Sequence, residues 1–352
     1  MKVILDNIIF CLQKTGGISV VWYELIKHLL DDINIDTFFV DYESKNILGS
    51  HLPIPIQKKI KLNSLIDNRY WNVVINQKQK FIFHSSYYRI CKNPHAINIT
   101  TVHDFTYEKY VHGLKKWLHS WQKKRAIMNS DFIICISENT KKDVLGYFPN
   151  IDPKKIRVVY NGVSEDYYVL PKKEQDIFFE KKYILFVGGR AGYKNFELAA
   201  LAVSQTQFDF VIVGAPLNKK EISFLKKIFG TLERIHVMGR ISNAVLNRLY
   251  NNAFALLYPS LYEGFGIPIL EAQKAGCPVI AYASSSIPEI MGDSPLLMHF
   301  ANKETIYQCL NSLEDKNFRA MVIKQGLENV KRFSWHKMYQ EVLSIYREAW
   351  KQ

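Results

Sequence analysis

The segment from Tyr258 to Glu289 reads Y-P-S-L-Y-E-G-F-G-I-P-I-L-E-A-Q-K-A-G-C-P-V-I-A-Y-A-S-S-S-I-P-E, and its order of residue types decides the fold. The apolar stretch Phe254 to Tyr258 predicts a short buried strand. Gly264 and Gly266 then predict a tight turn or a close approach of the backbone to a ligand. Pro268 suits the first turn of a following helix, because early helical N–H groups have no intrahelical partner. The segment therefore predicts a strand, a glycine turn, a helix start and a second strand.

Two acids, Glu263 and Glu271, flank this turn. The expected helix start between them is a ready site for an anion, because its free N–H groups and the helix dipole favour negative charge. Two interpretations of Glu271 stay open from the residues alone. An acid in the first helical turn is favoured by the dipole, and an acid beside an anion site can also bind a ligand. Glu263 has no obvious capping role, which favours a functional interpretation.

The run E-G-F-G-I-P-I-L-E resembles the E-x7-E motif of the family 4 retaining glycosyltransferases, which have the two-domain GT-B fold. The match includes the Phe-Gly turn, the proline, the downstream A-G-C-P-V-I strand and the S-I-P-E turn. The resemblance covers most of the chain. It is strong in 183–289 and looser in the first half.

Length and composition set the broad class of the protein. The 352 residues predict two domains of roughly 150–180 residues, and the 48% hydrophobic fraction is typical of a globular protein. We expect neither a signal peptide nor a membrane-spanning helix, because no run approaches ~18 apolar residues. The five scattered cysteines form no C-x-x-C pair, so we expect a reducing cytoplasm and neither disulfides nor a zinc site.

The formal net charge of +13 favours anionic partners in general. Part of this charge is concentrated in one basic segment. Between Glu108 and Asp131 there is no acid, and lysines are interleaved with Trp117 and Trp121, which share one face of an expected helix. Two interpretations stay open. The segment 109–125 lies on an anionic membrane surface, or it buries both tryptophans in the core and solvates its lysines.

The first half begins with an expected strand at 2–6 and an expected helix at about 20–30, with Gly16 and Gly17 between them. The spacing is not G-x-G-x-x-G, so the dinucleotide fingerprint is absent. A plain turn and a close approach to a ligand both fit the residues. The resemblance implies that Gly16 and Gly17 lie over the phosphates of the donor.

Polar residues also follow two later strands of the first half, where α/β folds bind ligands. An expected strand at 97–102 ends in His103 and Asp104. From the residues alone His103 fits a structural loop histidine, whereas the resemblance implies that it reaches the donor sugar. Tyr87 and Arg89 follow an expected strand at 81–84, and with Asp104 they are our candidates for the acceptor side.

The second half repeats the strand, glycine turn and helix order at Gly188-Gly189-Arg190-Ala191-Gly192-Tyr193-Lys194-Asn195. Two basic residues near a turn are ordinarily surface residues. The resemblance instead implies that Arg190 and Lys194 bind the diphosphate, whose oxygens suit the planar guanidinium. It also implies that the nucleotide base meets the chain at Gly239, Arg240 and Ile241, and that the donor is bound by Glu263, Phe265, Gly266, Ile267 and Glu271.

These observations predict an α/β fold of two Rossmann-like domains with parallel sheets that face each other across a cleft. We expect an acceptor-binding domain at 1–165 and a nucleotide-sugar domain at 166–333. The segment 164–180 has the composition of a linker. The resemblance implies that the last helix, 334–352, crosses back to the first domain.

The resemblance implies that a sugar moves, with retention, from a nucleotide diphosphate sugar to a hydroxyl of a saccharide acceptor. His103, Glu263, Arg190 and Lys194 would be the catalytic residues. No D-x-D occurs, so we expect no metal and no cofactor. A lipid-linked acceptor in bacterial O-antigen or capsule synthesis, and a cytoplasmic enzyme peripheral to the plasma membrane, follow from the family's usual roles. A nucleotide-sugar epimerase and a basic non-catalytic binding protein remain alternatives; nucleic-acid binding is disfavoured because the basic residues are dispersed.

Overall fold

The computed structural model describes residues 1–44, 46–60, 69–171 and 179–352. Contacts divide the chain into two compact units. Unit 1 contains Met1–Gly162 and Phe333–Gln352, and unit 2 contains Val163–Arg332. The expected domain boundaries were 165/166 and 333/334, whereas the two units change at Gly162/Val163 and at Arg332/Phe333.

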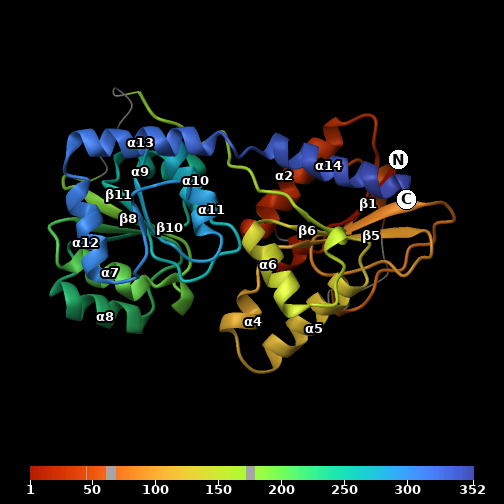
Figure 1. The fold of residues 1–352 in the computed structure, drawn as a ribbon, viewed down its shortest axis with the longest axis horizontal. Coiled ribbons are helices and arrows are strands. Elements are labelled where there is room, and N and C mark those ends of the chain that lie inside the picture. The colour runs from red at the N-terminus through yellow and green to blue at the C-terminus, as the bar shows by residue number, and fades with distance from the viewer. Residues whose placement is uncertain (45, 61–68, 172–178) are drawn as a thin grey trace. The chain divides into compact units, whose positions relative to one another are not determined.

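Unit 1 contains a seven-stranded parallel sheet in the order β3-β2-β1-β4-β5-β6-β7 (Figure 1). Its strands are nearly continuous apolar runs, as expected for a parallel sheet that is covered on both faces. The strands are β1 Lys2–Asp6, β2 Asp36–Val40, β3 Lys59–Ile60, β4 Phe81–Ser85, β5 Ala96–Val102, β6 Phe132–Cys135 and β7 Ile156–Val158.

Helices connect these strands and cover the sheet. They are α1 Ile9–Leu12, α2 Gly17–Asp31, α3 Ile47–Ser50, α4 Thr106–Tyr110, α5 Leu114–Met128, α6 Glu138–Tyr147 and α14 Trp335–Lys351, with short 3-10 helices at Ile56–Lys58 and Pro153–Lys155.

Unit 2 contains a six-stranded parallel sheet in the order β10-β9-β8-β11-β12-β13. The strands are β8 Tyr183–Val187, β9 Asp209–Val213, β10 Ile235–Gly239, β11 Ala255–Tyr258, β12 Val279–Tyr282 and β13 Leu297–Met298. The chain reverses its direction of winding between β8 and β11, which are neighbours in the sheet. Ligands of open α/β sheets bind at such a switch point, beside the carboxyl ends of the strands.

The helices of unit 2 form two groups, in which α7 contacts α8 and α12, and α10 contacts α9, α11 and α13. They are α7 Phe196–Ser204, α8 Lys219–Phe229, α9 Asn243–Asn252, α10 Ile267–Lys274, α11 Ile287–Met291, α12 Lys303–Ser312 and α13 Lys316–Val330, with a 3-10 helix at Gly192–Lys194. The expected class, two parallel-sheet α/β units, is confirmed.

The last helix belongs to unit 1 and lies against α2 (Figure 1). Ser334 caps it by accepting a hydrogen bond from Lys337 N at 3.0 Å. Its Tyr346 hydroxyl is 2.7 Å from His84 Nδ1 in β4. Helix α14 therefore completes the core of unit 1, although it follows unit 2 in the sequence.

The segment after the first crossing is packed in unit 2 and is not a free linker, as far as Pro171. Lys274 of α10 binds Ser164 O at 3.1 Å and Glu165 at 2.7 Å. Asn251 Oδ1 of α9 accepts from Leu170 N at 2.7 Å. The middle of the expected linker, 172–178, lies outside the described residues.

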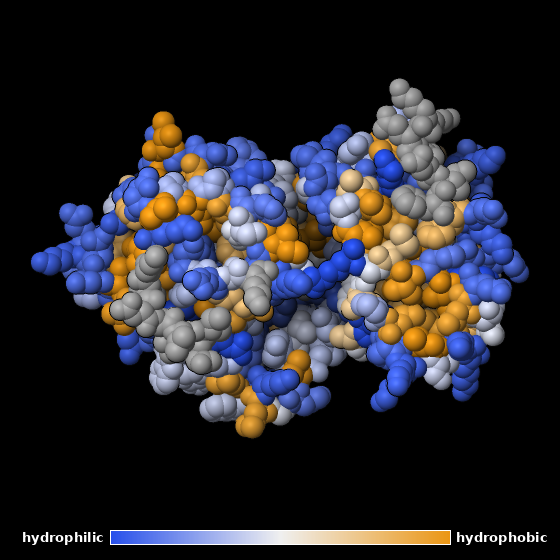
Figure 2. Space-filling view, turned by 180° about the vertical axis from the view of Figure 1, so that it is seen from behind, coloured by the Kyte–Doolittle hydropathy of each residue, from blue (hydrophilic) through white to orange (hydrophobic). Residues whose placement is uncertain are grey.

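Among the helices of the described ranges, none has the length and apolarity needed to cross a membrane. On the face drawn in Figure 2, hydrophilic side chains surround several hydrophobic patches, of which a broad one lies on the right.

Candidate functional site

The two glycine turns of unit 2 bring Lys194 and Glu263 together at the switch point. Lys194 follows β8 and Glu263 follows β11, and the Lys194 ammonium donates to Glu263 Oε1 at 2.5 Å. Glu263 is 9% exposed. A buried charge is stable only when it is paired and hydrogen-bonded. The pair is therefore built into the carboxyl edge of the sheet, where a ligand would bind.

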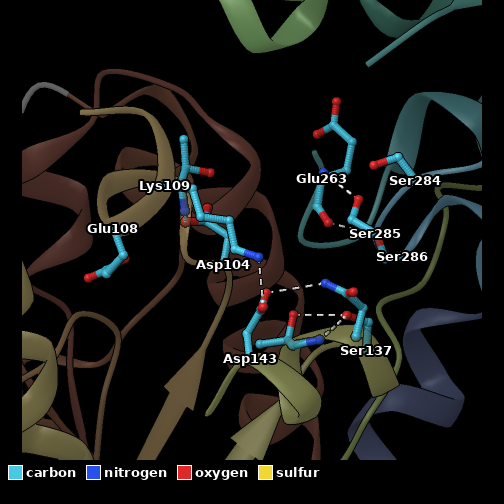
Figure 3. Close-up of polar contacts among 12 residues, drawn as sticks. Asp104, Glu108, Lys109, Ser137, Asp143, Glu263, Ser284, Ser285 and Ser286 are labelled. Carbon is cyan, nitrogen blue, oxygen red and sulfur yellow. Dashed lines mark hydrogen bonds and ion pairs between the residues drawn. The ribbon is translucent and has the colours of Figure 1, made fainter. Parts of the chain in front are cut away.

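The backbone around Glu263 is fixed by two serines that follow β12 (Figure 3). Glu263 N donates to Ser285 Oγ at 2.8 Å, and Ser286 Oγ donates to Glu263 O at 2.9 Å and Phe265 O at 3.0 Å. Ser285 has a φ of 51°, which is unusual for a residue with a side chain. Residues held in such conformations cluster at functional sites.

Helix α10 starts directly after this turn. Gly266 has a φ of 107°, a conformation that glycine adopts readily, and Pro268 occupies the first turn. Phe265 is buried at 4% exposure and anchors the turn. The N-terminus of α10 is thus directed to the same edge of the sheet as Lys194 and Glu263.

Arg190 has a different environment from Lys194. Its guanidinium donates to both carboxylate oxygens of Glu221, at 2.8 and 3.1 Å, and to the carbonyls of Ala215 and Pro216, at 2.9 and 2.8 Å. These four bonds use most of the five N–H donors of an arginine. The two cations expected to act together are therefore bound by different acids, Arg190 by Glu221 and Lys194 by Glu263.

The glycines in the turn after β8 have open space on the side where a side chain would point. A Cβ atom built on Gly188, Gly189 or Gly192 would meet nothing within 4 Å among the described residues. Gly188 has a φ of 122°, and a Cβ on Gly214 would lie 2.6 Å from Gly188 O. These turns therefore combine a close backbone approach with room for a ligand on the outer side.

Glu271 lies one helical turn inside α10. Tyr250 donates to its Oε2 at 2.9 Å. Part of Glu271 reaches the surface, but its carboxylate is packed among protein atoms. Burial raises the pKa of Glu271 to about 7, although hydrogen bonds from Tyr250 and Tyr167 oppose this shift. Glu271 is therefore not simply an acid that interacts with the helix dipole.

The residues expected to meet the nucleotide base lie at the carboxyl end of β10. Gly239 ends the strand with a φ of 63°, and Arg240 is exposed. Ile241 is followed by Ser242, whose Oγ caps α9 by accepting from Val245 N at 3.4 Å. They share the edge of the unit 2 sheet with the other donor candidates.

In unit 1, Gly16 and Gly17 form the N-terminus of α2. Gly16 N donates to Ser19 Oγ at 3.0 Å, and Ser19 Oγ donates to Gly16 O at 2.8 Å. A Cβ on Gly17 would meet nothing within 4 Å among the described residues, whereas one on Gly16 would lie 2.5 Å from Gln13 Oε1. Only the outer side of Gly17 thus offers open space at this helix start.

His103 is buried at the carboxyl end of β5, at 7% exposure. Burial lowers the pKa of its imidazole to about 4, with a smaller effect of the same sign from Lys123 and an opposing effect from Asp104. His103 is therefore neutral at physiological pH. It lines a small buried cavity together with His84, Thr101 and Asn161.

The three residues expected on the acceptor side have different environments. Arg89 is 3% exposed, lies 3.5 Å from Asp6 and donates to Tyr42 at 2.9 Å, so it belongs to a buried polar cluster. Tyr87 is half-buried, and its hydroxyl lies 2.9 Å from His119 Nε2. Asp104 is half-buried and accepts from Thr106 N at 2.9 Å.

A charged network lies behind Tyr87. The Lys123 ammonium is fully buried and donates to Glu108 at 2.6 Å and to Asp104 O at 2.7 Å. Burial alone would raise the pKa of Glu108, but His119, whose Nδ1 lies 3.7 Å from Oε1, and the charge of Lys123 outweigh it and lower the pKa to about 2. His119 connects this ion pair to the Tyr87 hydroxyl.

Helix α5 differs from the second interpretation of the basic segment, in which both tryptophans are buried and the lysines are solvated. Trp117 is 66% exposed and Trp121 is 39% exposed, so the interpretation that both tryptophans lie in the core is wrong. The lysines are not all solvated either, because Lys123 is completely buried. The outer face of α5 therefore presents tryptophan and lysine side chains to solvent.

Comparisons with known proteins agree with this architecture. The family model described as Glycosyltransferase Family 4 matches residues 15–167, and the model described as Glycosyl transferases group 1 matches residues 171–329. The chain belongs to the family 4 glycosyltransferases.

Individual relatives of this glycosyltransferase are distant. O-antigen chain mannosyltransferase B of Escherichia coli is 27% identical over 291 residues, which cover 76% of this chain and 74% of the relative. Sucrose-phosphate synthase from Thermosynechococcus elongatus superimposes with a TM-score of 0.75 at 16% identity, over 100% and 99% of the two chains. Anabaena HepE in complex with UDP-glucose gives 0.74 at 15% identity, over 99% and 100%. These structures establish the GT-B fold.

Several contacts in the enzyme's candidate site carried no local sequence signal. Tyr250 and Tyr167 contact Glu271 from other elements, and Ser285 and Ser286 contact the Glu263 turn across the sheet. Lys123 looked like one more surface lysine in a basic segment. In each case the partner is remote in the sequence, so only the folded chain reveals the contact.

The buried histidines of unit 1 predict acid lability. His84 is 1% exposed, and burial lowers its pKa to about 3, compared with about 4 for His103. The unfolded chain protonates both near their ordinary pKa of about 6.5. Stability present at neutral pH is therefore lost as the pH falls from about 6.5 toward 4, by about 1.4 kcal/mol per pH unit for each histidine.

Melting temperature as a function of pH checks this expectation. His84→Gln should show a shallower decline below pH 6.5 than the wild-type enzyme, because one of the two groups no longer titrates. His95→Gln, at an exposed position of the same unit, is the control and should follow the wild-type curve. Parallel curves for all three proteins would contradict the assignment.

Proposed function

We propose that this enzyme transfers a sugar from a nucleotide diphosphate sugar to a hydroxyl of a saccharide acceptor, with retention at the anomeric carbon and without a metal ion. The observation that supports this best is the Lys194–Glu263 pair, which joins the two glycine turns at the switch point of unit 2. Glu271 lies in α10, the helix that starts at this edge. A cation and two carboxylates in this order suit a ligand with both phosphates and hydroxyl groups.

In the proposed reaction, these residues stabilise the negative charge of the departing diphosphate. Lys194 and the N-terminus of α10 would stabilise the negative charge that develops on it. The Gly16–Gly17 turn would add backbone N–H groups. For Arg190 we propose an indirect role instead of direct diphosphate binding, in which it fixes the loop after β9 through Glu221 and the carbonyls of that loop.

The sugar and the ribose would be bound by the acids. Glu263 would accept hydrogen bonds from sugar hydroxyls and Glu271 from ribose hydroxyls, in the way an acid binds ribose in other nucleotide sites. His103, being neutral, would orient the sugar without adding positive charge beside a cationic transition state.

The proposed reaction takes place on the front face of the sugar. The bond from the anomeric carbon to the diphosphate oxygen breaks, the acceptor oxygen bonds to the same face, and the acceptor proton moves to the departing phosphate oxygen. This route needs no separate general base. The anomeric configuration of the product tests it, and an inverted product would refute it.

For the acceptor we propose a lipid-linked saccharide in the assembly of a bacterial surface polysaccharide. The E. coli relative is named for O-antigen chains. Tyr87 and Asp104, at the carboxyl ends of β4 and β5, would face the acceptor. Arg89 would support this side from within, because its guanidinium is bound to Tyr42 and lies beside Asp6.

The exposed face of α5 supports a further proposal, that the cytoplasmic enzyme binds the inner surface of the plasma membrane. Trp117 is largely exposed and Leu114 is 86% exposed, beside Lys115 and Lys116. Tryptophan, leucine and lysine together are typical of helices that lie in a membrane interface.

Removing two lysines from this face should weaken membrane binding. Lys115→Ala with Lys116→Ala should reduce the affinity for anionic vesicles about 30-fold at low salt, since each basic residue near such a surface contributes about 1 kcal/mol. Co-sedimentation with phosphatidylglycerol vesicles measures this. Lys226→Ala with Lys227→Ala, which changes the charge equally on α8, is the control; an equal loss in both variants, or no binding by the wild-type enzyme, would contradict the proposal.

Nucleotide binding is the most direct test of the proposed function. We expect one of UDP, GDP, dTDP, CDP and ADP to raise the melting temperature without added metal. A ligand at 100 times its Kd adds about 2.7 kcal/mol, a shift of several degrees for units of this size. A folded sample that responds to none of them would exclude the donor site. Isomerised donor released without an acceptor would instead indicate an epimerase, and salt-sensitive binding to oligonucleotides would indicate a binding protein.

A further inference from the structure

Two buried phenol groups contact the Glu271 carboxylate in unit 2. Tyr250 of α9 is 0% exposed, and its hydroxyl donates to Glu271 Oε2 at 2.9 Å. Tyr167 is 3% exposed and supplies a second hydrogen bond that favours the ionised carboxylate. The two rings meet edge to face, with centroids 5.9 Å apart. Close packing therefore fixes both hydroxyls with respect to Glu271.

Tyr167 belongs to the segment by which the chain enters unit 2, and this segment is bound to α9 at several points. The Tyr167 hydroxyl lies 3.2 Å from Asn243 Oδ1, so its single proton is shared between Asn243 and Glu271. Asn247 Oδ1 accepts from Tyr168 N at 3.1 Å, and Asn251 Nδ2 donates to Tyr168 O at 2.9 Å. Tyr167 and the residue that follows it are thus both held against α9.

The effect of the two tyrosine hydrogen bonds depends on the protonation state of the Glu271 carboxyl group. An ionised carboxylate accepts hydrogen bonds at both oxygens, whereas a protonated one loses part of this capacity. Burial favours the protonated form of Glu271, and the two tyrosine hydrogen bonds favour the ionised form. The other titratable groups that interact with this cluster are Asp166 beside Tyr167, Tyr258 at the end of β11, and Cys277 after α10.

We propose that Tyr250 and Tyr167 are positioning residues that keep the Glu271 carboxylate ionised and oriented to accept hydrogen bonds from the ribose hydroxyls of the donor nucleotide. This inference rests on the proposed function, because it presupposes that Glu271 meets ribose. It also makes the segment after the first crossing between the units a part of the nucleotide site.

Nucleotides with and without ribose hydroxyls separate positioning from general packing. Calorimetry would compare UDP and GDP with their 2′,3′-dideoxy counterparts on the wild-type enzyme, Tyr250→Phe and Tyr167→Phe. Each variant should bind the better ribonucleotide roughly tenfold more weakly, the effect of losing one hydrogen bond to a charged group. Binding of the dideoxynucleotide should change less than twofold.

The pH dependence gives a second measurement that packing alone would not change. Ribonucleotide affinity of the wild-type enzyme should fall as the pH drops below about 7, where Glu271 takes up a proton. Each tyrosine hydrogen bond lowers the pKa of Glu271. Its removal should therefore move this loss of affinity to higher pH, and an unchanged midpoint in both variants would overturn the proposal.

Tyr183→Phe is the matched control. Tyr183 is a buried tyrosine of the same unit, and its hydroxyl donates to Leu249 O at 2.7 Å. This variant should bind both nucleotides as the wild-type enzyme does. Equal losses for ribo- and dideoxynucleotide in the Tyr250 and Tyr167 variants would overturn the positioning role. Wild-type enzyme that binds both nucleotide types equally would overturn the contact with ribose, and wild-type enzyme that binds neither UDP nor GDP would overturn the donor site itself.

Discussion

Lys194→Ala is expected to lower kcat for sugar transfer by about 10²–10³-fold, because it removes the charge that we place beside the departing diphosphate. The same change leaves Glu263 without its ammonium partner at 2.5 Å. The unpaired carboxylate would then add negative charge where the transition state already develops it. The measurement is nucleoside diphosphate release from the donor whose base the binding panel identifies.

The control for this variant is Lys220→Ala, which removes the same charge from an exposed position at the start of α8. It should retain wild-type turnover. The melting temperature of Lys194→Ala should fall, because Glu263 loses its partner, so turnover is compared at a temperature at which both proteins remain folded. Near-normal turnover of Lys194→Ala would remove Lys194 from the catalytic proposal.

Lys123→Met should destabilise unit 1 by about 3–5 kcal/mol, the usual cost of removing one partner of a buried ion pair. The substitution leaves Glu108 buried beside His119 without the ammonium that lies 2.6 Å away. In a unit of this size the melting temperature should fall by roughly 6–20 °C. Differential scanning calorimetry measures it directly.

Lys124→Met provides the comparison, because Lys124 is the exposed neighbour of Lys123 on the same helix. It should change the melting temperature by less than 2 °C. Adding Glu108→Gln to Lys123→Met should recover part of the lost stability, since the unpaired charge is then removed. Equal melting temperatures for Lys123→Met and Lys124→Met would show that the buried pair contributes little.

Local patterns predicted the elements of the site well. The apolar run 254–258 forms β11, and the glycine turn with Pro268 starts α10, because strand and helix-start signals depend on neighbours in the sequence. The same order of strand, glycine turn and helix predicted the glycine turn at 188–192 before α7. Residue type and spacing were sufficient for these elements, and the E-x7-E resemblance led to the family and the GT-B fold.

Pairings between remote residues were not predictable in this way. Arg190 and Lys194 looked equivalent in the sequence, but they form ion pairs with different acids. Arg190 pairs with Glu221, which also belongs to the capping box of α8, and Lys194 pairs with Glu263. Lys123 resembled its solvated neighbours, yet it is the one whose ammonium meets Glu108. Both outcomes depend on which elements the sheet brings side by side, and no local pattern contains this information.

The return of α14 to unit 1 has a consequence for the order in which the enzyme folds during synthesis. Unit 2 is a continuous stretch of chain, whereas unit 1 needs residues from both termini. Trp335, Met338 and Tyr346 are buried in unit 1, but the ribosome releases them only after the whole of unit 2. Domains ordinarily fold from the N-terminus onward. Here the second unit is complete first, and the sheet of the first unit keeps the surface that α14 will cover exposed until α14 emerges.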